Sequence, residues 1–105
     1  MESISVKDLA ARMKSDNAPI LIDVREPHEH DYARIEGAQL KPLGDIYTWV
    51  QELDREREYV IHCHTGRRSA YAAQVLRQMG FKKVKNLTGG IDAWSAQVDP
   101  NVPRY

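Results

Sequence analysis

One short segment holds most of the residues that could do chemistry. Cys63, the only cysteine among 105 residues, is followed by Gly66, Arg67 and Arg68. A thiolate is a strong nucleophile, and nearby positive charge and free N–H groups can lower a thiol pKa from about 8.5 into roughly the 3.5–7.5 range. A cysteine buried only for packing needs neither a glycine nor two arginines beside it. The pattern therefore predicts a reactive cysteine in an anion-binding loop.

This loop needs a strand before it and a helix after it. Residues 59–62 form an apolar run typical of a strand in a parallel sheet, and a helical pattern starts at about Ser69. Ligands of open α/β sheets bind beyond the carboxyl ends of the strands, which is where Cys63 stands. The helix N-terminus would bring N–H groups to the sulfur, and a protonated His62 or His64 would add positive charge.

The rest of the chain repeats this alternation of strand and helix. Apolar runs predict strands over residues 20–24, 39–41, 59–62 and 84–87, and helical spacing appears over residues 5–13, 46–53, 69–79 and 91–98. We therefore expect one α/β domain over residues 1–105 with a mostly parallel sheet, ending in an extended surface tail over 98–105.

Composition limits the classes of partner and compartment. Fifteen basic residues balance fifteen acidic ones, so we expect neither a nucleic acid nor a membrane as partner. The acidic N-terminus is unlike a signal peptide, and a single cysteine suits a reducing compartment, so we expect a cytoplasmic protein. His28 and His30 lack the further ligands of a metal site and are expected on a solvated surface.

Four segments together resemble the rhodanese family, in the order and spacing that the family has. The sequence VIHCHTGRRSA, residues 60–70, resembles its active-site loop, C-x-x-G-x-R. The other three segments are LIDVRE at residues 21–26, IEGA at 35–38 with Pro42, and LTGGIDAW at 87–94. Ala33 and Arg34 depart from the Gly-His pair that usually precedes the second segment. We expect that change to affect local packing only.

The resemblance implies a fold, a reaction and a set of site residues. The fold is a single rhodanese-like domain with a mostly parallel five-stranded sheet and helices on both faces. The activity is sulfur transfer without a metal or organic cofactor, from a small anionic donor such as thiosulfate to cyanide, a thiol or a sulfur-carrier protein. Cys63 would carry the sulfur as a persulfide. The substrate cradle would consist of His64, Thr65, Gly66, Arg67, Arg68 and Ser69, with Arg68 closing the loop.

Two other functions compete with this one. Cysteine phosphatases and arsenate reductases use a similar loop with arginine six residues after the cysteine, but here that position is Ser69 and the arginine is Arg68. The shorter loop suits a sulfur atom better than a tetrahedral phosphate. A rhodanese-like binding module without catalysis is the other alternative, although such modules usually lose the cysteine.

Several remaining residues have structural or open interpretations. Asp23 and Arg25 follow a strand and are expected to form a structural ion pair near the site. Trp49 and Trp94 lie on apolar helical faces and are expected in the core. For His64, a role toward an acceptor and a solvent-facing position remain equally open. The tail over 98–105 is similar to the ends of rhodanese domains fused to adenylating enzymes of molybdopterin and thiamine sulfur carriers, which suggests such a carrier as acceptor.

Overall fold

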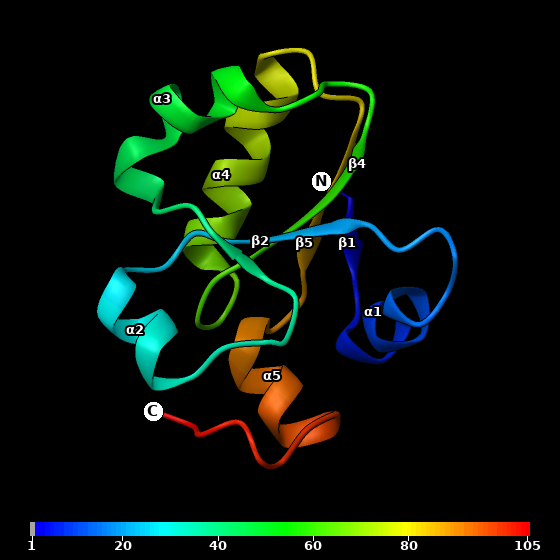
Figure 1. The fold of residues 1–105 in the computed structure, drawn as a ribbon, viewed down its shortest axis with the longest axis vertical. Helices are drawn as coiled ribbons and strands as arrows, with labels where there is room; N and C mark the ends of the chain where they lie inside the picture. Colours follow the sequence, from blue (N-terminus) through cyan, green and yellow to red (C-terminus); the bar gives the residue numbers. More distant parts are fainter. Residues whose placement is uncertain (1) are drawn as a thin grey trace.

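A parallel sheet of five strands runs through the centre of the molecule (Figure 1). The structure, a computed structural model, describes residues 2–105. The strands lie in the order β1-β5-β4-β2-β3, and every neighbouring pair is parallel. Their bounds are β1 Ser3–Ile4, β2 Ile20–Asp23, β3 Gln39–Leu40, β4 Glu58–His62 and β5 Lys83–Leu87.

Helices connect the strands. The α-helices are α1 Val6–Met13, α2 Pro27–Tyr32, α3 Ile46–Trp49, α4 Arg67–Gln78 and α5 Gly90–Gln97, and two short 3₁₀ helices, η1 Leu43–Asp45 and η2 Val50–Glu52, flank α3. Within residues 2–105, none of these helices combines the length and the apolarity that crossing a membrane requires. The α/β fold that the sequence predicts is thus confirmed.

Alternate residues of the central strands supply two separate cores. Ile22 and Ile61 pack on one face of the sheet with α3 and α4, whereas Leu21 and Val60 pack on the other with α1 and α5. Both faces are covered, so these strands are apolar on both sides, as is usual in parallel sheets. Trp49 belongs to the first core and Trp94 to the second, which confirms their expected packing roles.

Two boundaries differ from the sequence expectation. The helix after Cys63 begins at Arg67, earlier than the expected Ser69, because Gly66 has a φ of 114° and serves as the N-cap. The expected helix over residues 46–53 consists of α3 followed by the 3₁₀ turn η2. Strand β1 was not predicted, since two residues are too few to show a pattern.

The sheet brings the ends of β2 and β4 together. In the register of this pair, Asp23 lies opposite His62, directly before Cys63. The carboxyl ends of two neighbouring strands therefore meet beside the cysteine, and the elements α2, α4 and α5 all begin near this edge. The topology thus delivers the expected Cys63 segment and the Asp23–Arg25 segment to one place.

Candidate active site

Cys63 lies directly after β4 and is almost completely buried, with 1% of its surface exposed. The backbone N–H of Gly66 donates to its Sγ at 3.1 Å, and the hydroxyl of Ser69 lies 3.3 Å from the same sulfur. Ser69 itself is fully buried in the first turn of α4. Two of the expected cradle residues therefore contact the sulfur directly.

The surroundings of Cys63 favour its thiolate. Burial alone would raise the thiol pKa, because it disfavours the charged form. Hydrogen bonds from the Ser69 hydroxyl and from the N–H groups of Ser69, Gly66 and Thr65 oppose burial, and the net effect lowers the pKa of Cys63 below its ordinary value. These N–H groups belong to a helix start and the loop before it, where no intrahelical partner competes for them.

Asn86, on the neighbouring strand β5, supports the loop from the side. Its amide nitrogen donates to the Gly66 carbonyl at 3.1 Å, and its Oδ1 lies 2.5 Å from the Ser69 hydroxyl. The Ser69 hydroxyl has one proton, so it can donate to Asn86 Oδ1 or to the sulfur but not to both. Ionisation of the thiol would favour donation to Cys63. Sequence reasoning missed Asn86. Its neighbours Lys83 and Lys85 are also polar, so Asn86 gave no distinct signal in the sequence of this strand.

The N-terminus of α5 forms hydrogen bonds with the backbone of the cysteine loop. The N–H of Ile91 donates to the Cys63 carbonyl and that of Asp92 to the His64 carbonyl, both at 3.0 Å. Gly90 permits this close approach, because a Cβ there would lie 2.4 Å from the His64 oxygen. The carbonyls of residues 63 and 64 are thus occupied by α5, which leaves the loop N–H groups on the side of the sulfur.

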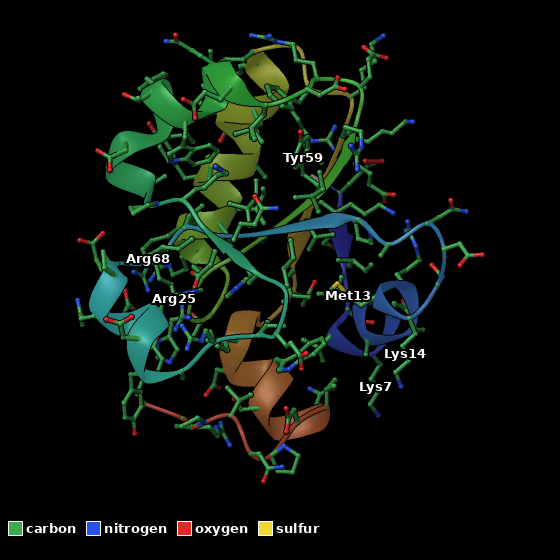
Figure 2. All side chains as sticks on the ribbon, in the orientation of Figure 1. Lys7, Met13, Lys14, Arg25, Tyr59 and Arg68 are labelled. Carbon is green, nitrogen blue, oxygen red and sulfur yellow. The ribbon has the colours of Figure 1, made fainter. Side chains whose placement is uncertain are left out.

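Arg68 leaves the loop toward α2. Its guanidinium forms two hydrogen bonds with the Glu29 carboxylate, at 2.7 and 3.0 Å, and Figure 2 shows Arg68 beside α2. This pairing holds the pKa of Glu29 far below its usual range. Arg67 and Thr65 are exposed. The loop therefore offers its N–H groups and Arg67 to an incoming anion, and Arg68 lies beside it in an ion pair with Glu29. Sequence reasoning also missed Glu29.

Asp23 and Arg25 form a completely buried ion pair next to this site. Arg25 Nε and Nη2 contact the carboxylate at 2.9 and 2.7 Å, as a structural pair would. His30 Nδ1 lies 2.9 Å from Asp23 Oδ2. The expectation of a solvated His30 is therefore wrong: α2 turns its ring inward to the carboxylate, whereas His28 is exposed. Burial would raise the pKa of Asp23, but Arg25 and the histidines outweigh it and lower that pKa.

Residues 5–97 match the family description of the rhodanese-like domain. The chain belongs to this family. It is 36% identical over 100 residues to the putative sulfurtransferase YtwF of Bacillus subtilis, covering 95% of this chain and 96% of YtwF. It is also 36% identical over 96 residues to the putative sulfur carrier protein YrkF of the same organism, covering 91% of this chain and 52% of YrkF.

Solved structures agree with this assignment. A rhodanese-related protein from Thermoplasma volcanium is 30% identical and superposes with a TM-score of 0.83, covering 98% of this chain and 96% of that one. The chain spans only 27% to 52% of the length of several curated relatives that it matches. The fold and the family are therefore shared, and YtwF, which matches over nearly its whole length, is named a putative sulfurtransferase.

Two expectations about this rhodanese-like domain need correction. His62 cannot supply positive charge near neutral pH, because complete burial lowers its pKa to about 4. The tail over 98–105 is not simply extended on the surface. It begins with a turn, and its last residue, Tyr105, contacts Arg25, Glu29 and His64.

The contact between Ser69 and Cys63 leads to a first prediction. Replacing Ser69 with alanine removes a hydrogen bond to the thiolate, so the thiol pKa should rise. The ultraviolet absorbance of the thiolate, which here reports a single cysteine, should then titrate at higher pH. Below the wild-type midpoint, reactions of the thiolate should slow by about 3- to 10-fold.

Ser95→Ala is a matched control for this prediction. Ser95 is also a buried helical serine, and its hydroxyl has no partner within residues 2–105. Its replacement should leave the titration unchanged. A Ser69→Ala variant that titrates like the wild type would show that the backbone N–H groups alone set the pKa of Cys63.

Proposed function

We propose that this rhodanese-like domain is a sulfurtransferase that carries sulfane sulfur as a persulfide on Cys63. The observation that supports this most directly is the position of Sγ, beyond the end of β4 and within reach of the Gly66 N–H and the Ser69 hydroxyl. The same donors that favour a thiolate would also favour the terminal anion of a persulfide. The family assignment and the sulfurtransferase names among its relatives support the same reaction.

The first half-reaction would load the cysteine. The Cys63 thiolate attacks the outer sulfur of thiosulfate with a lone pair and forms a new S–S bond. The S–S bond of thiosulfate breaks, and its electron pair leaves with sulfite. The negative charge of the thiolate passes to the outer sulfur of the persulfide. No proton, metal or oxidant enters this step, and the loop N–H groups stabilise an anion before and after it.

The second half-reaction would unload it. An acceptor thiolate, or cyanide, attacks the outer sulfur, and the S–S bond to Cys63 breaks. The products are an acceptor persulfide, or thiocyanate, and the regenerated Cys63 thiolate. Because the chain has no second cysteine, an intramolecular disulfide cannot release the sulfur. An external acceptor is therefore part of the proposal.

We propose a thiol or a sulfur-carrier protein as this acceptor, and the cytoplasm as its compartment. The relative YrkF is named a putative sulfur carrier protein, which supports an acceptor of this type. For the donor we propose a small sulfur anion. The exposed Arg67 and the loop N–H groups favour the binding of negative charge beside Cys63.

The test is a measurement of intact protein mass after incubation with a donor. Thiosulfate, polysulfide and a cysteine-desulfurase donor are compared at matched concentration. We expect the mass to increase by one sulfur atom and to return to its starting value when cyanide is added. An unchanged mass with all three donors would contradict the proposal and favour a binding module. Release of phosphate from an aryl phosphate would instead favour the phosphatase.

A further inference from the structure

The Tyr105 side chain connects two ion pairs beside the candidate site. Its hydroxyl donates to Glu29 Oε2 at 2.7 Å and accepts from Arg25 Nη1 at 2.9 Å. Glu29 holds Arg68, and Arg25 holds Asp23. One neutral phenol thus links a buried ion pair to the ion pair of the cysteine loop.

The Tyr105 ring also covers the residue after the cysteine. It stacks on the His64 imidazole with ring centroids 4.0 Å apart and planes 10° apart. His64 Nε2 is buried and has no hydrogen-bond partner within residues 2–105. An unpaired ring nitrogen favours a turn toward water, and the stacked phenol opposes that turn. The Tyr105 ring therefore opposes rotation of the His64 ring.

The tail is also connected to the loop through Arg104 and Asp92. Arg104 pairs with Asp92 through two hydrogen bonds, at 3.0 and 3.1 Å, and the N–H of Asp92 donates to the His64 carbonyl. In Figure 1 the tail, in red, runs from α5 to the side of α2. The end of the tail lies beside α2, where Tyr105 contacts Glu29 and His64.

The Glu29 carboxylate has no free position in this network. Its Oε1 accepts from Arg68 and from the Glu26 N–H, and its Oε2 accepts from Arg68 and Tyr105. Without the phenol, Glu29 Oε2 and the buried Arg25 Nη1 would each lose a partner. Water or a rearranged Arg68 would have to replace it, so the Tyr105 hydroxyl restricts where the Arg68 charge can lie.

We propose that Tyr105 is a positioning residue for sulfur transfer, acting through His64 and Arg68 on either side of the loop. This inference rests on the proposed function. Tyr105 does not contact the sulfur in any hydrogen bond of the described residues, and the N–H groups that face Cys63 do not depend on it. Its effect is therefore expected mainly on the binding of an anionic donor beside the loop.

The two parts of the Tyr105 contact can be tested separately. Tyr105→Phe keeps the ring on His64 but removes the hydroxyl, whereas Tyr105→Leu removes both. We expect kcat/KM with thiosulfate to fall about 3-fold in the first variant and at least about 10-fold in the second, mainly through KM. The ring-current shift of the His64 protons in NMR spectra should persist in the first variant and disappear in the second.

Tyr47→Leu is the matched control, since Tyr47 is also an exposed tyrosine but lies on α3. It should keep the wild-type kcat/KM and His64 shifts. A Tyr105→Leu variant that loses the His64 shift yet keeps wild-type kcat/KM, in an active protein, would overturn the role of Tyr105 alone. A wild-type protein that takes up no sulfur would overturn the proposed function and this inference together.

Discussion

Replacing Cys63 with serine is expected to abolish sulfur transfer while leaving the fold intact. Serine is slightly smaller and its hydroxyl can accept the same hydrogen bonds from Gly66 and Ser69 that the sulfur accepts. An alcohol, however, is not ionised near neutral pH and cannot form a persulfide. Turnover with thiosulfate and cyanide should fall by at least about 10⁴-fold, as expected when a nucleophile is removed.

Two measurements separate loss of chemistry from loss of structure in this variant. Intact mass should show no added sulfur, and the free energy of unfolding in urea should stay within about 2 kcal/mol of the wild type. The Ser95→Ala protein, altered at another buried position, should load sulfur normally. Measurable uptake of sulfur by Cys63→Ser would show that another group carries it.

Replacing Gly90 with alanine is expected to damage both stability and activity. Gly90 has a φ of 58°, and a Cβ there would lie 2.4 Å from the His64 oxygen and 2.6 Å from the Cys63 oxygen. The backbone of the loop would have to move away from α5, at a cost of about 2–4 kcal/mol in the free energy of unfolding. A displacement of the N–H groups by about 1 Å should also slow persulfide formation about 100-fold.

Gly44→Ala is the matched control for Gly90. Nothing lies within 4 Å of a Cβ at Gly44, and its φ lies outside the left-handed region. That variant should unfold within about 0.5 kcal/mol of the wild type and load sulfur at the same rate. Denaturant titrations and the time course of intact mass provide both numbers. Equal behaviour of the two variants would show that the loop does not depend on close packing against α5.

The strands and helices next to the site were predictable because their patterns are local. Apolar runs identified β2 and β4, and the helical spacing after Gly66 identified α4. Strand β1 was not predictable, since its two residues become a strand only by pairing with β5, which lies more than 80 residues away in the sequence. The start of α4 was misplaced because a glycine cap leaves no side-chain signal of the usual kind.

The cysteine loop of the candidate site was predictable, but the side chains that contact it from other elements were not. The cysteine, glycine and arginines all lie within residues 63–68, so their proximity follows from the chain itself. Glu29, Asn86 and Tyr105 reach the loop from α2, β5 and the tail, and only the tertiary fold brings them there. The ring of His30 turns inward because its partner Asp23 ends β2, the strand before α2, and only the packing of α2 against the sheet brings the two side chains together.

The hydrogen bonds from α5 to the Cys63 and His64 carbonyls also affect the order in which the site forms during synthesis. The chain emerges from the ribosome N-terminus first, so β4 and the cysteine loop appear well before Ile91 and Asp92. Until α5 docks, ordering the loop with its N–H groups toward the sulfur costs about 1–2 kcal/mol of conformational entropy per residue. We therefore expect the pKa of Cys63 to fall below its ordinary value only after α5 has docked on the loop.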